Sequence, residues 1–189
     1  MLELNFKAAV LFKQNKDLKV IKIQTKDKLT KGQVLVKIIY SGICRSQLME
    51  VQGARGDDRW LPHMLGHEGS GIVESIGPGV TKVNVGDEVI LSWISGEGIE
   101  AEGAKYDSEI AVINSGQVTT FSNYSVVSEN KLTIKPDSLD FNTAILFGCA
   151  LPTGSGMVMN ELDVTQDSSI AVLGLGGIGI SAVAMLLSM

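Results

Sequence analysis

Residues 169–189 carry the pattern that most restricts what the chain can fold into. An apolar run at 169–173 leads directly into a Gly-x-Gly-x-x-Gly motif formed by Gly174, Gly176 and Gly179, and the remainder of the segment has helical composition. A strand, this motif and a helix, in that order, are typical of the first unit of a dinucleotide-binding fold, where the glycines permit a tight turn and a close approach to a pyrophosphate. The segment therefore predicts a phosphate-binding βα unit. A glycine-rich turn without a ligand is the alternative.

The residues before this segment alternate short apolar runs with turns rich in glycine. Such a pattern predicts a compact β-barrel or β-sandwich. Because Val34–Tyr40 is apolar on both faces, we expect it to be well buried, whereas the polar Ser95–Gln117 segment is predicted to be a long loop or insertion. The other expected strands are Lys7–Phe12, Leu18–Gln24, Gly69–Ile76, Val89–Trp93 and Thr119–Val127, and the expected helices are Arg45–Val51, Asp140–Phe147 and Pro152–Asn160.

Glycines flank a histidine–glutamate pair within Gly66–Gly71. His67 and Glu68 are of the side-chain types that most often bind a borderline metal or transfer a proton. The only two cysteines of the chain, Cys44 and Cys149, also lie close to glycines. These four residues form a candidate zinc set whose members are distant in sequence. An ordinary surface loop at His67 and a Cys44–Cys149 disulfide are the alternatives.

Composition excludes several classes of protein. The formal net charge is −5 and no long basic run is present, so the sequence gives no electrostatic case for nucleic-acid binding. No run approaches 18 apolar residues and no signal peptide is visible, so neither a membrane span nor secretion is expected. Two cysteines far apart in sequence indicate a reducing compartment. We therefore expect a cytoplasmic protein with reduced thiols.

Taken together, the motifs resemble those of the zinc-dependent medium-chain alcohol dehydrogenases. The similar segments follow the family's order from Lys7 to Gly179. The resemblance implies mainly β structure combined with α/β structure: a GroES-like β-barrel catalytic domain over residues 1–160, followed at 161–189 by the incomplete beginning of an NAD(P)-binding Rossmann domain. The segments that carry the resemblance are Gly42–Ser46, Gly66–Val73, Val85–Val89, Gly148–Cys149 with Thr153–Gly154, and Gly174–Gly179.

The resemblance assigns roles to individual residues of the candidate zinc set. Cys44, His67 and Cys149 match the ligands of a catalytic zinc, and this set leaves a fourth position open for water or substrate. Glu68 matches a glutamate that approaches or enters the zinc shell. Ser46 matches the hydroxyl that takes the proton from the alcohol, although plain helix capping or a backbone hydrogen bond is the alternative for this residue.

The resemblance also implies a coenzyme site. Arg45 matches a residue near the coenzyme pyrophosphate, and Thr153 matches a threonine near the nicotinamide. Gly174, Gly176 and Gly179 complete the expected site at the start of the Rossmann domain. For Arg45 the alternative is a surface ion pair, and for Thr153 it is plain helix capping or a backbone hydrogen bond. The acidic residue that reads the ribose is expected about 20 residues after the motif, outside the sequence, so NAD and NADP both remain open.

Several positions depart from the family's pattern. Many relatives hold a structural zinc with four closely spaced cysteines, but this chain has none between Cys44 and Cys149, and Ser95–Gln117 occupies that place. Met49 replaces the histidine that passes the proton on to water in the best-known relatives. Gln47 replaces a common aspartate, which predicts a different support for the metal ligands. His63 has no matching family residue and is interpreted as structural.

The sequence thus predicts an oxidoreductase that interconverts an alcohol and an aldehyde or ketone, with one catalytic zinc, no structural zinc, and NAD or NADP. A small-molecule substrate and a homo-oligomer are expected, with no nucleic acid or membrane as partner, and Trp60 and Trp93 are candidate walls of the substrate pocket. One alternative is a zinc-free quinone or enoyl reductase of the same fold. The other is a truncated product that binds zinc without turnover, because the present segment is expected to be inactive by itself. The apolar tail after Ser169 is expected to need a partner chain or to be mobile.

Overall fold

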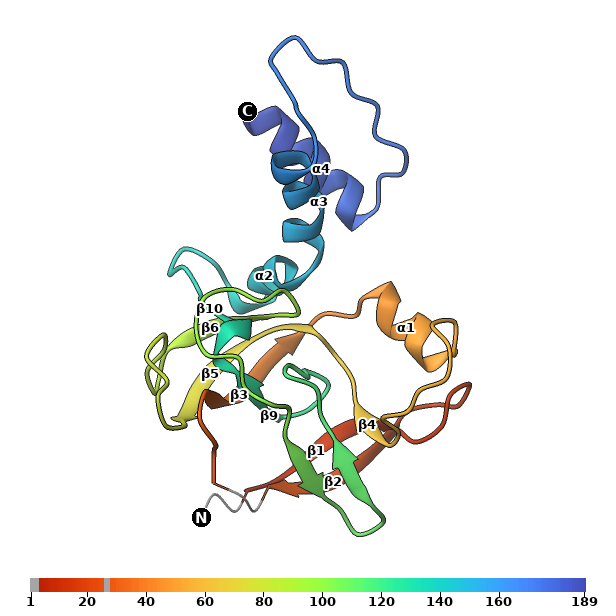
Figure 1. Cartoon of the computed structure of the whole chain (residues 1–189), viewed down its shortest axis with the longest axis vertical. Helices are drawn as coiled ribbons and strands as arrows, with labels where there is room; N and C mark the ends of the chain where they lie inside the picture. The colour runs from red at the N-terminus through yellow and green to blue at the C-terminus, as the bar shows by residue number, and fades with distance from the viewer. Residues whose placement is uncertain (1–3, 26–27) are drawn as a thin grey trace.

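The computed structural model describes residues 4–25 and 28–189, in which two β layers lie below a stack of helices (Figure 1). One layer is a closed barrel with the strand order β1-β2-β7-β8-β4, and the other is a five-stranded sheet with the order β10-β6-β5-β3-β9. The barrel strands are β1 (Leu4–Leu11), β2 (Lys19–Thr25), β4 (His63–Met64), β7 (Lys105–Asp107) and β8 (Val112–Asn114). The sheet strands are β3 (Gln33–Ser41), β5 (Glu68–Ile76), β6 (Glu88–Ser92), β9 (Tyr124–Ser128) and β10 (Leu132–Ile134).

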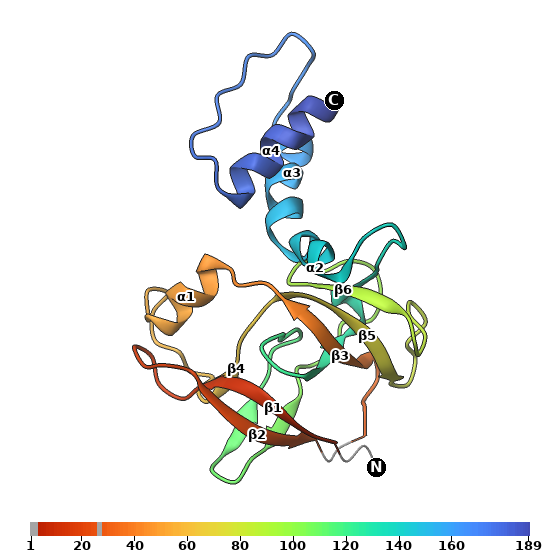
Figure 2. The same cartoon turned by 180° about the vertical axis from the view of Figure 1, so that it is seen from behind.

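The helical elements are short. They are α1 (Arg45–Val51), η1 (Glu129–Lys131), α2 (Phe141–Ala144), η2 (Ile145–Gly148), α3 (Ala150–Asn160) and α4 (Gly177–Ser188). Helix α1 covers one side of the β layers, whereas α2, α3 and α4 rise from the end of the sheet (Figure 2). None of the helices in the described part of the chain is long and apolar enough to cross a membrane.

The barrel is filled by aromatic and aliphatic side chains that alternate along its strands. Tyr106 is fully buried, and its ring meets the ring of Phe6 edge to face at a centroid distance of 5.5 Å. Its hydroxyl accepts a hydrogen bond from the backbone N–H of Val126 at 2.8 Å, which satisfies the polar atom of a buried tyrosine. The predicted β-barrel is confirmed.

The segment Ser95–Gln117 is not wholly a loop, and that prediction was wrong for its second half. It contributes β7 and β8, which close the barrel between β2 and β4. Each strand has three residues, too few to show a periodic pattern in the sequence. Their central side chains, Tyr106 and Ile113, are both fully buried.

Strand β3 lies between β5 and β9 but is buried only over its first half. Its pairing with β9 covers Gln33–Lys37, and beyond that range β5 continues as its neighbour. Tyr40 is consequently 49% exposed, and the prediction of burial along the whole strand was wrong. Sequence alone did not indicate that one of the two flanking strands ends early.

The C-terminal segment differs from its prediction in one respect. Helix α4 is present, but residues 169–173 form no strand, and Leu173 is 94% exposed. A strand needs a neighbour for its backbone hydrogen bonds, and no described strand lies beside this run. Helix α4 instead packs along α3 (Figure 1), where Gly154 allows an approach so close that a Cβ there would lie 2.2 Å from the Ile178 carbonyl oxygen.

Candidate metal centre

The pairing of β3 with β5 brings Cys44 and His67 to the same edge of the sheet. The strands are antiparallel, and Ser41 at the end of β3 lies opposite Gly69 near the start of β5. Cys44 follows the first position and His67 precedes the second, so two residues distant in sequence become neighbours in space. Sheet register, rather than local sequence, therefore determines that these two residues meet.

Cys149 reaches the same place from the helical end of the chain, between η2 and α3. The preceding Gly148 packs directly on the sheet, because a Cβ at this position would lie 2.5 Å from the Leu91 carbonyl oxygen and 2.8 Å from the Glu68 Cβ. The Ser92 hydroxyl also donates to the Gly148 carbonyl oxygen at 2.8 Å. Only glycine permits this contact, and the contact places Cys149 beside β5.

The three candidate ligands converge. One donor atom from each of Cys44, His67 and Cys149 lies within 4.8 Å of the other two. The two sulfurs are 3.9 Å apart and both cysteines are free, so the alternative of a disulfide, with sulfurs about 2.0 Å apart, is wrong. Two thiolates bound to one tetrahedral zinc, each at about 2.3 Å, lie about 3.8 Å apart. The donor set and its spacing fit zinc.

Burial perturbs the titratable groups of this cluster in the protein alone. It lowers the pKa of His67, with a further contribution from the charge of Arg55, and this favours the neutral imidazole that a metal requires. Burial raises the pKa of Glu68. Burial, followed by the charges of Cys44 and Glu68, raises the pKa of Cys149 to about 11. Anionic groups are crowded here, and a cation would reverse the effect on the thiols.

Three buried polar atoms near the cluster have no hydrogen-bond partner within the described residues: Ser46 Oγ, His67 Nε2 and Thr153 Oγ1. Buried polar atoms are normally paired, so each exception needs an explanation. All three belong to the residues singled out from the sequence, and side-chain capping does not account for Ser46 or Thr153. Atoms of this kind are consistent with partners that the protein itself does not supply.

The remaining sequence candidates lie around this cluster. Glu68 is buried against Gly42, where a Cβ would lie 2.7 Å from the Glu68 Cδ. Arg45 is exposed at the first position of α1. Gly174 has a φ of +95°, and a Cβ at Gly179 would lie 2.0 Å from the Gly174 carbonyl oxygen. The turn at Gly174 therefore packs against the first turn of α4, as the glycines predict, although no strand precedes the motif.

Gly174 and Gly176 are both exposed, and Gly176 is the N-cap of α4. The backbone at this helix N-terminus is therefore accessible. An exposed N-terminus is the geometry on which the predicted phosphate-binding role depends.

Gln47, which replaces a common aspartate of the family, contacts the backbone next to one of the candidate ligands. Its side-chain oxygen accepts a hydrogen bond from the backbone N–H of Gly66, next to His67. Its amide group donates to Glu50 at 3.2 Å. Trp93, considered from the sequence only as a pocket wall, lies near enough to Cys149 to lower the pKa of its thiol, against the larger effect of burial. Nothing in the sequence distinguished this tryptophan from Trp60.

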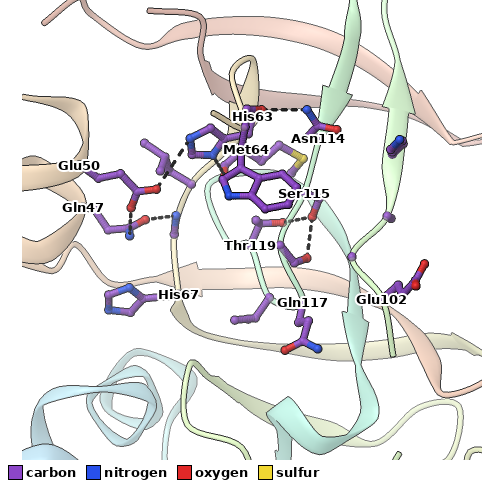
Figure 3. Close-up of a pocket in the computed structure, with 18 residues that line it drawn as sticks. Gln47, Glu50, His63, Met64, His67, Glu102, Asn114, Ser115, Gln117 and Thr119 are labelled. Carbon is purple, nitrogen blue, oxygen red and sulfur yellow. Dashed lines mark hydrogen bonds and ion pairs between the residues drawn. The ribbon is translucent and has the colours of Figure 1, made fainter. Parts of the chain in front are cut away.

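A cavity of about 620 Å³ opens beside the cluster and is lined by His67 (Figure 3). Trp60 also lines this cavity, as predicted for a pocket wall, and 60% of its surface is exposed. Polar side chains from β8 and the following loop complete the lining, among them Asn114, Ser115 and Gln117. A space of this size beside a candidate metal ligand is suited to a small-molecule substrate.

Comparison with known proteins identifies the family. The family described as "Alcohol dehydrogenase GroES-like domain" matches residues 30–137. The S-(hydroxymethyl)glutathione dehydrogenase of Synechocystis sp. is 33% identical over 204 residues, which cover 94% of this chain and 54% of that protein. The class-3 alcohol dehydrogenase of Dictyostelium discoideum is 32% identical over 200 residues, which cover 93% of this chain and 52% of that protein. This chain belongs to the alcohol dehydrogenase family with a GroES-like domain.

Solved structures agree with this assignment. The benzyl alcohol dehydrogenase from Acinetobacter calcoaceticus superimposes with a TM-score of 0.81 at 30% identity, over 98% of this chain and 56% of that one. The predicted resemblance to zinc-type alcohol dehydrogenases and the GroES-like fold class are confirmed. The chain spans about half the length of the curated relatives that it matches.

Proposed function

We propose that this chain carries the catalytic site of a zinc-dependent oxidoreductase that interconverts an alcohol and an aldehyde or ketone with NAD or NADP. The proposal rests chiefly on the convergence of Cys44, His67 and Cys149 within 4.8 Å. Membership of the alcohol dehydrogenase family supports the reaction class. A second support is the cavity beside His67, which is large enough for a small organic substrate.

The metal would be held by the two thiolates and the imidazole. Zinc bound there supplies a Lewis acid that lowers the pKa of an alcohol oxygen. The protein's part is to fix this donor set: Gly148 brings Cys149 against the sheet, and Gln47 holds the backbone next to His67. Glu68 lies buried beside the cluster, where its charge interacts with Cys149, and it is the residue proposed to adjust the charge at the metal.

Ser46 is proposed to accept the proton released by the alcohol. Its hydroxyl lies two positions after Cys44 and is buried without a partner among the described residues, so it is available for a substrate oxygen. Met49, on the same helix, offers no titratable group to pass the proton onward. The proton would therefore have to leave Ser46 through water or through hydroxyl groups that the coenzyme would supply.

The coenzyme supplies the hydride acceptor. Thr153 has a buried hydroxyl with no hydrogen-bond partner in residues 4–25 and 28–189 and is proposed to face the nicotinamide. Arg45 is proposed to face the pyrophosphate, together with Gly174, Gly176 and Gly179. In this proposal residues 1–160 form the catalytic domain and residues 161–189 begin the coenzyme domain. We also propose that the protein is cytoplasmic and forms a homo-oligomer.

Metal analysis of the full chain, purified without a chelator, tests the proposed centre. We expect one zinc per chain held by thiolates, and Cys44→Ser and Cys149→Ser should each remove most of it. Replacing zinc with Co²⁺ should produce thiolate-to-metal absorption in the unchanged chain that weakens in both variants. Met49→Ala, on the exposed side of the same helix, is the control and should retain zinc. A chain without zinc, or one whose zinc content survives Cys44→Ser, would contradict the proposal.

An activity assay distinguishes the proposed enzyme from the two alternatives, a zinc-free reductase and a zinc-binding product without turnover. A zinc-free quinone or enoyl reductase should reduce such substrates with NADPH or NADH whether or not zinc is removed. A zinc-binding product without turnover should hold zinc and leave NAD and NADP unreduced in the presence of any alcohol. The proposed enzyme, assayed in its complete form, should reduce the coenzyme with an alcohol and lose that activity when a chelator removes zinc.

A further inference from the structure

A second group of metal-binding side chains lies outside the Cys44–His67–Cys149 cluster. Glu50 from α1, Asp58 from the following loop and His63 from β4 each place one donor atom within 4.8 Å of the other two. His63 Nε2 is 2.6 Å from Asp58 Oδ2 and 3.7 Å from Glu50 Oε1. The side chains of His63 and Asp58 are 9% and 7% exposed, and that of Glu50 is 28% exposed. Figure 3 shows Glu50 directed toward the His63 ring.

Each of the three side chains is oriented by a hydrogen bond through its other polar atom. His63 Nδ1 lies 2.8 Å from the Met64 carbonyl oxygen and donates to it. Asp58 Oδ1 accepts from the backbone N–H of Trp60 at 2.9 Å, and Glu50 Oε2 accepts from the Gln47 amide at 3.2 Å. Outer contacts of this kind are those that orient the ligands of protein metal sites. The structure therefore directs the second polar atom of each group toward a common point, where His63 Nε2 and Asp58 Oδ2 form a hydrogen bond with each other at 2.6 Å.

The contact with Met64 also determines what His63 presents to the carboxylates. A carbonyl oxygen can only accept, so Nδ1 carries the proton, and in the neutral imidazole Nε2 then has a lone pair. Nε2 is 2.6 Å from Asp58 Oδ2, a hydrogen-bond distance that requires a proton between the two atoms, and 3.7 Å from Glu50 Oε1. Without that proton, the three atoms are electron-rich and repel one another in a largely buried place unless another positive charge lies among them.

No arginine or lysine among the described residues supplies that charge. Within residues 4–25 and 28–189, no Lys or Arg nitrogen forms an ion pair with Glu50 or Asp58. Arg55 and Arg59 line a smaller cavity of about 250 Å³ beside the group, but the Arg59 guanidinium stacks on the Trp60 ring at 5.0 Å. A proton on His63 would balance one of the two carboxylates. A divalent cation would balance both.

We propose that Glu50, Asp58 and His63 bind a divalent cation. A cation about 2.1 Å from each donor places the donors roughly 3 to 3.5 Å apart, so the present spacing needs only a small widening between His63 and Asp58. Access comes from both sides, because Glu50 and His63 line the cavity of about 620 Å³ and Glu50 and Asp58 line the smaller one. The remaining coordination positions face these spaces and are open to water or to substrate oxygens.

The donors distinguish this cation from the one proposed at the cysteines. Thiolates select soft and borderline metals, whereas two carboxylates and an imidazole suit harder cations such as Mn²⁺. The two centres should therefore take different metals. The second cation would lie on the wall of the cavity that His67 also lines, where it can bind oxygen atoms of a substrate remote from the reacting carbon.

Titration of the full, zinc-loaded chain with Mn²⁺, followed by the EPR signal of free Mn²⁺, tests the proposal. We expect one saturable site. Asp58→Asn and Glu50→Gln keep the shape of each side chain but remove its charge, and each should weaken Mn²⁺ binding by at least about 10-fold, the scale on which changes around a metal reduce its affinity. The matched control is Asp57→Asn, which changes an exposed neighbour lining the same small cavity and should bind as the unchanged chain does.

Cys44→Ser separates this proposal from the proposed function, since it should lose zinc but retain Mn²⁺. Circular dichroism establishes that each variant is folded, and Glu50→Gln, the least buried of the changes, serves if Asp58→Asn does not fold. The proposal is overturned if the unchanged chain binds no Mn²⁺ at about millimolar concentration. It is equally overturned if Asp58→Asn and Glu50→Gln bind as tightly as the control, or if Cys44→Ser abolishes Mn²⁺ binding.

Discussion

Removing the carboxylate of Glu129 should destabilise the chain more than any loss of an exposed charge. Its side chain is fully buried. Oε1 accepts hydrogen bonds from the backbone N–H groups of Thr81 at 2.6 Å and Lys82 at 2.8 Å, and Oε2 accepts one from Ile99 at 2.7 Å. The carboxylate thus joins the turn before β6 to the loop after it.

The size of the effect follows from these three contacts. Glu129→Ala leaves three backbone donors without an acceptor, each costing about 1–3 kcal/mol when buried. Water entering the space will satisfy part of that loss, so we expect a decrease of about 3–5 kcal/mol in the free energy of unfolding. In Glu129→Gln the amide oxygen can still accept hydrogen bonds from the N–H groups of Thr81 and Lys82. The NH₂ group of the glutamine then faces the N–H of Ile99. One bond is lost and two donors oppose each other, which predicts a decrease of about 2–3 kcal/mol.

The dependence on pH has a definite sign. Burial opposes ionisation of Glu129, but the backbone donors Ile99, Lys82 and Thr81, with the charge of Lys82, outweigh it and lower the pKa. A group whose pKa is lower in the folded chain stabilises it above the unfolded value, about 4.3 for glutamate, and loses that contribution as pH falls through the folded value. The difference in stability between the unchanged chain and Glu129→Gln should therefore be constant near neutrality and shrink below about pH 4.

Denaturant unfolding followed by circular dichroism, at several pH values, measures both effects. Glu97→Gln is the matched control, because it removes an exposed carboxylate from the same loop and should change stability by less than about 0.5 kcal/mol. If Glu129→Gln were no less stable than this control, the three backbone contacts would not be stabilising. If the difference grew on acidification, the direction assigned to the pKa would be wrong.

Three further changes test the site and the fold. In the complete enzyme, Ser46→Ala should lower kcat by about 10²-fold or more while leaving zinc content unchanged, and an unaltered kcat would remove Ser46 from the proton path. Gly66 has a φ of +92°, and a Cβ there would lie 2.3 Å from Thr120 Oγ1. Gly66→Ala should therefore lower the free energy of unfolding by about 1–3 kcal/mol and reduce the zinc content. A zinc content equal to that of the unchanged chain would show that the turn does not position His67. Tyr106→Phe leaves the Val126 N–H unpaired inside the barrel and should lower the free energy of unfolding by about 1–3 kcal/mol in denaturant titrations, whereas no change would mean that water replaces the hydroxyl.

The sequence predicted the elements whose patterns are local. Helix α1 has the bounds expected from its composition, Arg45–Val51, and the barrel was expected from short strands between glycine turns. The sequence did not predict β7 or β8, because strands of three residues are too short to show a periodic pattern. The strand expected at 169–173 failed for the opposite reason. Its apolar pattern is clear, but a strand also needs neighbours.

The candidate site was predictable in its members but not in its geometry. Residue types and the family resemblance selected Cys44, His67 and Cys149, and their roles remain predictions. Their convergence depends on the register of β3 with β5 and on the contact of Gly148 with the sheet, which no local pattern specifies. His63 was interpreted as structural from sequence. Its neighbours Glu50 and Asp58 lie 13 and 5 positions before it, and only the fold of the intervening loop brings all three together.

The loop between β6 and β7 is held in place by hydrogen bonds rather than by thiolates. No cysteine lies between Cys44 and Cys149, so metal-bound cysteines within this loop cannot anchor it. Side chains of Ser128 and the adjoining η1 perform that task. Ser128 Oγ accepts from the Ala101 N–H at 2.8 Å, Glu129 holds Ile99, and Lys131 Nζ donates to the Trp93 carbonyl oxygen at 2.8 Å and to Ser95 Oγ at 2.7 Å. Since these bonds involve no metal, a chelator that strips the cysteine cluster should leave this loop in place.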